Sequence, residues 1–141
     1  MIGAGQSVSY EGRFERKQLT EAEKDELQLK NLFEDNEVRA AFKQLAGKDL
    51  DYILQCFFAT QPIKPNDPYL KEVIEGWCPG VTPWENGILG IANSKLTLMF
   101  VDCRPKKTVI RFRTNDKRHL TVPKSFAPCL SDKKDMPIIH D

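Results

Sequence analysis

"KLTLMFVDCRPKKTVIRFRT", residues 95–114, is the stretch that decides the fold, because its apolar residues recur at every second position. Leu96, Leu98 and Phe100 share one face of a predicted strand, and the segment 107–114 alternates in the same way. The short connection RPKK between the two segments makes them an antiparallel pair. The sequence therefore predicts a β-hairpin here.

Two further segments on either side of this hairpin also read as short strands. They are GILGIA at 87–92 and RHLTV at 118–122, joined to the hairpin by the turn-forming pairs NS and ND. We predict an antiparallel meander of three or four strands. One face of the meander should pack on helices and the other should be partly solvated.

The N-terminal half shows the helical period of 3.6 residues instead. Thr20 and Glu23 have the spacing of a capping box at the start of a first helix. Asp35 or Asn36 can cap a second helix, and Asp49 a third. Both have apolar residues at i, i+3, i+4 and i+7.

A fourth helix is predicted for PYLKEVIEGW, residues 68–77, after a loop at 59–67. Its inner face would be Leu70, Val73, Ile74 and Trp77. The predicted fold class is α+β, with an N-terminal half of about four short helices packed on the C-terminal meander. We expect a flexible lead-in at 1–15, a single domain at 16–123 and an irregular tail at 124–141, because neither end shows strong periodicity.

Composition gives the class of protein but no partner. The chain has 141 residues and a net charge of +1. It contains four cysteines without close pairs, no basic and apolar leader, and no apolar run of membrane-spanning length. We therefore expect an intracellular protein, in cytoplasm or nucleus, with reduced thiols and no membrane partner.

Charge is distributed unevenly along the chain, and the hairpin is its basic part. Residues 104–124 contain eight bases and one acid, whereas residues 11–37 contain nine acids and five bases. The candidate binding residues of the basic hairpin are Arg104, Lys106, Lys107, Arg111, Arg113, Lys117 and Arg118. Such a surface can steer an acidic partner.

Three interpretations of the basic hairpin remain open. Its cations could contact an acidic protein partner, or the chain's own acidic helix. They could instead contact the phosphates of RNA or another single-stranded nucleic acid. They could also form a solvated sheet face, where edge lysines discourage aggregation. Aromatic residues for base stacking are lacking, because Phe100 and Phe112 are better explained as core.

The loop between the helical and strand regions is a second candidate surface. GWCPGVTPWENG, residues 76–87, contains two tryptophans and is rich in proline and glycine. Trp77 belongs to the predicted fourth helix, so Trp84 is the residue expected to anchor a partner. The alternative is that both rings cover the junction between helices and sheet.

No pattern of residues points to a metal, a cofactor or catalysis. The four cysteines and two histidines lack the paired spacing of zinc ligands. Phosphate-binding glycine loops and GxSxG or HExxH motifs do not occur, and a nucleophile would require Cys103 to meet His119 across the hairpin. We predict a non-catalytic interaction or regulatory module that binds an acidic partner through the basic hairpin and Trp84. The alternative is binding of RNA or single strands by the same hairpin.

Overall fold

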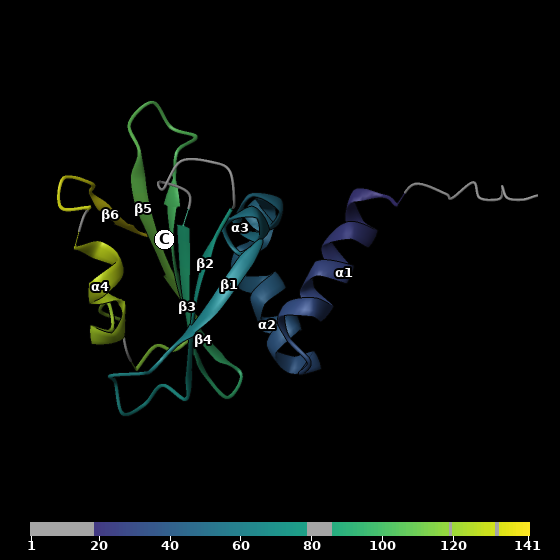
Figure 1. Ribbon diagram of the computed structural model, residues 1–141, viewed down its shortest axis with the longest axis horizontal. Coiled ribbons are helices and arrows are strands. Elements are labelled where there is room, and N and C mark those ends of the chain that lie inside the picture. Colours follow the sequence, from purple (N-terminus) through teal and green to yellow (C-terminus); the bar gives the residue numbers. More distant parts are fainter. Residues whose placement is uncertain (1–18, 79–85, 119, 132) are drawn as a thin grey trace, which may run out of the picture.

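Three N-terminal helices precede a six-stranded sheet in a computed structural model, which describes residues 19–78, 86–118, 120–131 and 133–141 (Figure 1). The helices are α1 (Glu21–Leu32), α2 (Asn36–Ala46) and α3 (Leu50–Cys56), with the 3-10 turn η1 (Gly47–Asp49) before α3. The strands are β1 (Ala59–Ile63), β2 (Glu72–Trp77), β3 (Asn86–Ala92), β4 (Lys95–Asp102), β5 (Val109–Thr114) and β6 (Ile138–His140). A 3-10 turn, η2 (Lys124–Phe126), and one helical turn, α4 (Ala127–Leu130), connect β5 to β6.

The strands lie in the sheet in their chain order, and each of the first five is antiparallel to its neighbour. The predicted hairpin is confirmed: β4 pairs with β5, with Leu98 opposite Arg113 and Phe100 opposite Arg111. The last strand, β6, is parallel to β5. β6 can run parallel to β5 because the segment that connects them, with η2 and α4, first passes over one face of the sheet.

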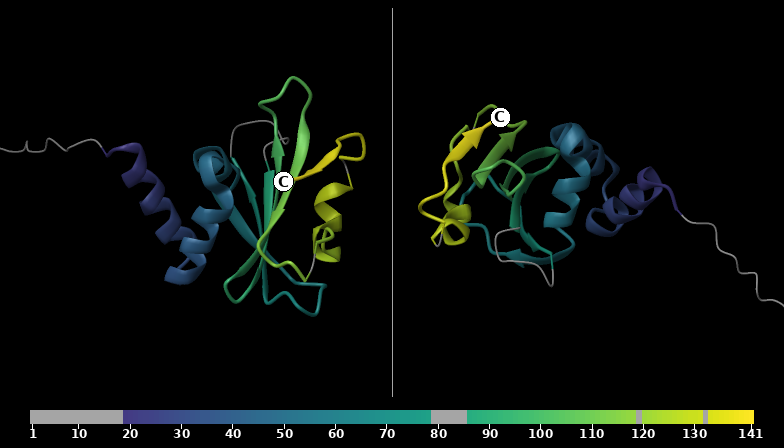
Figure 2. Two further views of the ribbon diagram at one scale, coloured as in Figure 1. Left: turned by 180° about the vertical axis from the view of Figure 1, so that it is seen from behind. Right: turned by 90° about the horizontal axis from the view of Figure 1, so that it is seen from above.

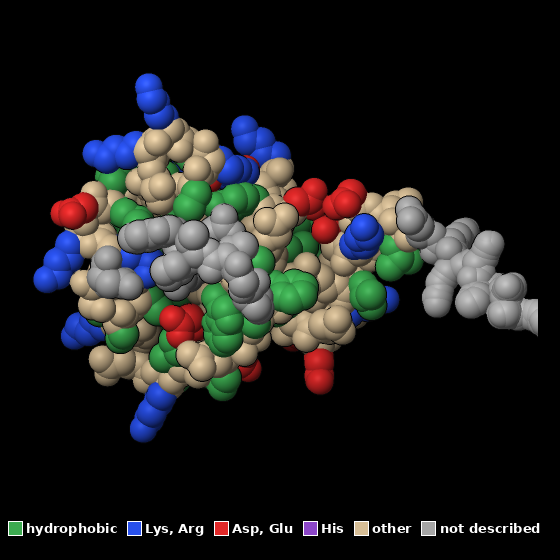
Figure 3. All heavy atoms as spheres, turned by 45° about the horizontal axis from the view of Figure 1, so that its top comes forward, with side chains coloured by type: hydrophobic (Ala, Val, Ile, Leu, Met, Phe, Trp, Pro, Cys, Tyr) green, Lys and Arg blue, Asp and Glu red, His purple; other side chains and the backbone are tan. Residues whose placement is uncertain are grey.

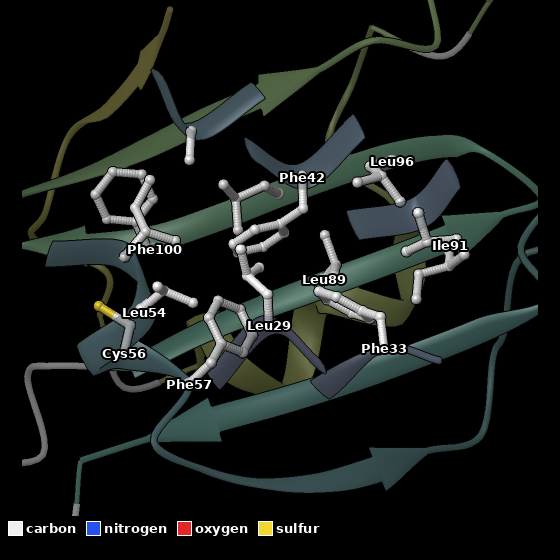
Figure 4. Packing of buried hydrophobic residues seen from close by; sticks show 14 residues of the cluster. Leu29, Phe33, Phe42, Leu54, Cys56, Phe57, Leu89, Ile91, Leu96 and Phe100 are labelled. Atoms are coloured by element: carbon white, nitrogen blue, oxygen red, sulfur yellow. The ribbon is translucent and has the colours of Figure 1, made fainter. Parts of the chain in front are cut away.

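Both faces of the sheet are covered. The helices lie over one face, where Leu89, Leu98 and Phe100 pack with Phe42 and Leu29 (Figure 4). The segment with η2 and α4 lies over the other face (Figures 1 and 2). This second face was expected to be partly solvated. It buries a second cluster of Val73, Ile88, Met99, Val101, Ile110, Phe112 and Phe126.

The starts of α1 and α2 follow from the sequence as predicted. Thr20 Oγ accepts from the N–H of Glu23, and the Glu23 carboxylate accepts from the N–H of Thr20, which completes the capping box. Asp35 caps α2 by accepting from the N–H of Glu37. Gly47 ends α2 with φ of 57°, a conformation that glycine adopts without strain.

The predicted fourth helix is wrong, because residues 72–77 form β2. Val73 faces the cluster under α4, while Ile74 packs against the cluster under the helices. A strand buried on both faces does not alternate, so its apolar residues can match helical spacing by coincidence. The helical half therefore has three helices, and Trp77 lies in a strand with 37% of its surface exposed.

The sheet is also larger than predicted, with six strands in place of three or four. Residues 59–63 were expected to be loop, and they form the edge strand β1, where Pro62 is tolerated. The segment 124–141 was expected to be irregular, and it contains η2, α4 and β6. In contrast, 118–122 forms no strand in its described residues. Within the described ranges, no helix has the length and apolar composition needed to cross a bilayer.

Candidate functional site

An open pocket of about 520 Å³ lies where β4 ends, beside β5 and the turn η1. Four cationic and three anionic side chains face it. We call it the arginine pocket, and its lining residues are Lys48, Asp49, Asp102, Arg104, Pro105, Arg111, Arg113 and Asp141.

The carboxylate of Asp102, at the end of β4, is the buried centre of the pocket and only 1% exposed. One oxygen, Oδ1, accepts from Arg104 Nε at 2.8 Å and from the Arg104 N–H at 3.0 Å. The other, Oδ2, accepts from Arg104 Nη2 at 3.0 Å and from Arg111 Nε at 2.7 Å. Four charge-assisted or backbone hydrogen bonds thus hold one carboxylate in place.

Asp49 and the C-terminal end of α2 fix the third arginine. Arg113 Nη2 donates to Asp49 Oδ2 at 2.5 Å, and Arg113 Nη1 donates to the carbonyl of Ala46 at 2.9 Å. The free carbonyls at a helix C-terminus favour a cation. Asp49 also accepts from Arg104 Nη1 at 3.0 Å. Its side chain makes no capping hydrogen bond to α3, so the predicted role as a cap is replaced by binding of arginine.

Asp141 closes the pocket from the other side. Its Oδ1 accepts from Arg111 Nη1 at 3.2 Å, and its Oδ2 accepts from Arg113 Nε at 2.8 Å. The strand β6 positions this residue, because its backbone pairs with β5 up to His140. Arg111 and Arg113 therefore act as a pair that holds the Asp141 carboxylate beside β5.

Aromatic rings support two of the three guanidinium groups. Arg104 lies over the Tyr52 ring at 4.2 Å, and Arg113 lies over the Phe100 ring at 5.4 Å. Tyr52 itself is fixed, since its hydroxyl donates to the Val101 carbonyl at 3.2 Å and accepts from the Cys103 N–H at 3.0 Å. Stacking and hydrogen bonding together restrict these arginines to one geometry.

The strand register explains why these side chains meet. Arg111 stands opposite Phe100, so both project from the face of the sheet that the helices cover. Asp102 lies two residues beyond Phe100 on the same face. On this face β4 carries the apolar side chains of Leu98 and Phe100, whereas β5 carries Arg111 and Arg113. Arg113 lies beside the end of α2.

The carboxylates of the pocket are held in the charged form. Burial alone would raise the pKa of Asp102, but the hydrogen bonds from Arg104 and Arg111 outweigh it and hold that pKa well below its usual range. The hydrogen bond from Arg113 likewise lowers the pKa of Asp49, against an opposing effect of burial. Both groups stay anionic near neutral pH, and the arginines stay cationic.

The cationic side chains of the predicted basic hairpin lie in three separate places. Arg104, Arg111 and Arg113 line the arginine pocket. Lys106 and Lys107 are exposed in the loop between β4 and β5.

Lys117 and Arg118 follow the opposite end of β5, about 20 Å away along the strand. Arg118 is 71% exposed and pairs with the buried Asp116 at 2.9 Å. Figure 3 shows the Lys and Arg side chains spread around the rim of one face, without a single basic patch.

The remaining sequence candidates are Trp84, His119, Cys103 and the acidic helix. Trp84, the predicted aromatic anchor, and His119 lie outside the described residues. Cys103 is half-buried next to Tyr52, and none of the four cysteines forms a disulfide. Among the described residues, the acids that bind Arg104, Arg111 and Arg113 are Asp49, Asp102 and Asp141, and none of these lies in the acidic helix α1.

Four charged pocket residues were missed by sequence reasoning: Lys48, Asp49, Asp102 and Asp141. One signal was present for Asp102, which continues the buried face of Leu96, Leu98 and Phe100. An acid on a buried face requires a cationic partner, and the next strand offers two arginines. Asp49 and Asp141 carried no such signal, since they lie far from β5 in the sequence.

Comparison with known proteins finds no matching family, no similar curated protein and no similar solved structure.

Proposed function

We propose that this chain is a non-catalytic protein-interaction module that binds an acidic segment of a partner protein at the arginine pocket. The observation that carries the proposal is the convergence of three arginines and Lys48 on one open pocket. Planar guanidinium groups recognise carboxylates with two parallel hydrogen bonds, and here stacking and buried aspartates hold them ready. The volume of the arginine pocket is in the range of sites that bind small ligands.

The balance of charge in the pocket supports an anionic ligand. With all three aspartates in place the lining carries a net charge of +1. Asp49 and Asp102 are integral, being 12% and 1% exposed. Asp141 is less buried, at 25%, and without it the remaining lining would carry +2. An incoming carboxylate thus meets a net positive site that is preorganised.

A catalytic role fits the lining less well. Among the described residues that line the pocket, none is a histidine, cysteine, serine or threonine. The carboxylates of Asp49 and Asp102 are poor general bases near neutral pH because their pKa values are lowered. We therefore keep the proposal of a binding function without catalysis.

Nucleic-acid binding is the alternative, and the described residues support it less. The central strands of the sheet have no open face on which bases could stack, because helices cover one side and η2 with α4 the other. The exposed lysines Lys106 and Lys107 are separated from Lys117 by the length of β5. A phosphate backbone would thus meet scattered cations, several of which already bind aspartates.

Fluorescence anisotropy with two probes tests the proposal. The probes are a short labelled peptide of mixed glutamate, aspartate and glycine, and a labelled oligouridine. Each is titrated with the wild-type chain, with Lys48→Glu and with Lys95→Glu at low ionic strength. Lys48 is exposed at the pocket, whereas Lys95 is exposed at the far end of β4 and changes net charge equally.

The proposal predicts that the acidic peptide binds and that Lys48→Glu weakens it about tenfold, while Lys95→Glu has little effect. Equal weakening by both variants would mean that overall charge, and not the pocket, attracts the peptide. Binding of oligouridine but not of the peptide would replace the proposal with nucleic-acid binding. No binding of either probe would overturn both.

A further inference from the structure

The strand β6 is held at the edge of the sheet by little buried surface. All three of its residues are exposed, with Ile138 at 38% and Ile139 at 37%. Its contacts are the backbone ladder to β5 and the packing of the His140 ring on Phe112, with ring centroids 5.0 Å apart. Short strands with little burial open at low free-energy cost.

Specific backbone hydrogen bonds nevertheless fix the position of residues 137–141 along β5. The N–H of Ile110 donates to the carbonyl of Pro137 at 2.9 Å, and the N–H of Asp141 donates to the carbonyl of Phe112 at 3.0 Å. The Asp141 carboxylate then enters the arginine pocket beside Arg111 and Arg113. Backbone pairing and charge recognition are thus combined in one extended segment.

We propose that the β5 edge and the arginine pocket form a docking groove for an extended acidic segment of a partner protein. The segment adds as a strand parallel to β5 in place of β6. This inference rests on the proposed function and specifies its mode of binding. The chain's own residues 137–141 are then an internal competitor that occupies the groove when no partner is bound.

The bound segment Pro137–Asp141 indicates the chemistry of the partner. Its main chain must be free to pair over at least three residues, opposite Ile110, Arg111 and Phe112. An acidic side chain must follow, placed to reach Arg111 and Arg113 as Asp141 does. The second and third positions before it can be apolar, as Ile139 and Ile138 are in this chain, although both are exposed at the sheet edge.

A matched pair of peptides tests this mode of binding. One labelled peptide with blocked ends copies residues 135–141, DMPIIHD, and the other replaces the isoleucine at 139 with proline, so that charge is unchanged. Proline cannot donate to a strand ladder. Both are titrated by anisotropy into the wild-type chain and into the full chain carrying Ile139→Pro. The Ile139 N–H points toward β5, as that of Asp141 does two residues on, so this variant loosens β6 without changing charge.

We expect Ile139→Pro to bind the DMPIIHD peptide about tenfold more tightly than the wild-type chain does, because the competitor is weakened. The proline peptide should bind the Ile139→Pro variant no more tightly than it binds the wild-type chain. Circular dichroism checks that the variant is folded. If it is not, Asp141→Asn replaces it, since this variant keeps the backbone pairing and loosens only the anchor in the pocket; a gain for DMPIIHD over the proline peptide is again expected.

Other outcomes overturn the inference in distinguishable ways. Equal binding of both peptides would show that the pocket recognises acid without strand addition, and the proposed function would survive alone. The same conclusion would follow if the glutamate–aspartate peptide binds but DMPIIHD binds the Ile139→Pro variant no more tightly than it binds the wild-type chain. A wild-type dimer that the DMPIIHD peptide dissociates in sedimentation velocity would identify a second copy of the chain as the occupant. If no peptide binds, the proposed function fails and the inference with it.

Discussion

Asp102 is the single residue on which the arginine pocket most depends. Its carboxylate is nearly inaccessible to solvent, and it holds both Arg104 and Arg111. We predict that Asp102→Asn lowers the free energy of unfolding by about 2–3 kcal/mol, because an amide cannot replace the charged acceptor. Urea denaturation near neutral pH measures this loss.

The pH dependence of that loss follows from the lowered pKa of Asp102. A carboxylate with a lowered pKa stabilises the fold above its unfolded pKa, and this contribution is lost as the pH falls through the folded value. The difference between wild type and Asp102→Asn should therefore shrink below about pH 4. Asp135→Asn, at an exposed site, is the control and should change stability by less than about 0.5 kcal/mol. A loss no larger than in the control would contradict the account.

Asp25 should behave in the opposite way. Burial and a hydrogen bond with Asp51, between α1 and α3, raise the pKa of Asp25 to about 6. The folded chain then binds a proton more tightly than the unfolded chain, so stability falls as the pH rises from about 4 through 6. We predict that Asp25→Asn stabilises the chain by about 1 kcal/mol at neutral pH and not at pH ~4. Thermal melts at both pH values check this, and equal gains at the two would refute it.

At the scale of elements, two glycines create the space in which α3 meets the sheet. Gly76 on β2 stands opposite Gly87 on β3, and the Phe57 ring lies over both. A Cβ atom on Gly76 would come within 2.6 Å of the Cys56 carbonyl oxygen and 2.8 Å of the Phe57 Cα. Because these are backbone atoms, α3 would have to move away from the sheet.

We predict that Gly76→Ala lowers the free energy of unfolding by about 2–3 kcal/mol. Gly90→Ala is the matched control, because the nearest atoms to its Cβ would be side-chain atoms, the methyl ends of Leu70 at 3.0 Å and the Phe126 ring at 3.5 Å. Chemical denaturation of both variants ranks them. A larger loss for Gly90→Ala would contradict the proposed packing of Phe57.

Asp67 attaches the C-terminal segment to the loop before β2. Its carboxylate accepts from the Ser125 hydroxyl at 2.6 Å, the Ser125 N–H at 2.8 Å and the Lys124 N–H at 3.1 Å. Burial would raise the pKa of Asp67, but the hydrogen bonds from Ser125 and Lys124 outweigh it and keep the pKa low. This anchor lies upstream of β6, so β6 can leave β5 while η2 and α4 stay in place.

We predict that Asp67→Ala lowers the free energy of unfolding by about 2 kcal/mol and that hydrogen exchange accelerates in residues 124–130. Ser125 is only 3% exposed, and the variant would leave its hydroxyl and N–H without this acceptor. Ser131→Ala, which removes an exposed hydroxyl that donates to Pro128, is the control. Unchanged exchange in 124–130 would contradict the anchoring role.

Local patterns predicted the elements that local interactions determine. Thr20 with Glu23 marked the start of α1, and the alternation of Leu96, Leu98 and Phe100 marked β4, because capping and pleating act between near neighbours. The strand β2 was missed because its identity depends on burial from both sides. The segment after Pro123 was missed because its order depends on Asp67, a distant residue that sequence spacing does not connect to it.

At the scale of the whole molecule, the arginine pocket exists only because three distant parts of the chain meet. Asp49 comes from the helical half, Asp102 and the arginines from the central hairpin, and Asp141 from the position directly after the last strand. The basic character of the hairpin was predictable from the sequence. The pairing of its arginines with Asp49 and Asp141 was not, since no pattern within one segment contains it.

The most direct measurement of the central claim is an NMR titration of the ¹⁵N-labelled chain with the glutamate–aspartate peptide. The account predicts that the largest shift changes occur at the Nε–H groups of Arg111 and Arg113 and at the amides of Lys48 and Arg104. Strongest changes at Lys95 or Lys117, which do not line the pocket, would contradict it, as would a spectrum that the peptide leaves unchanged.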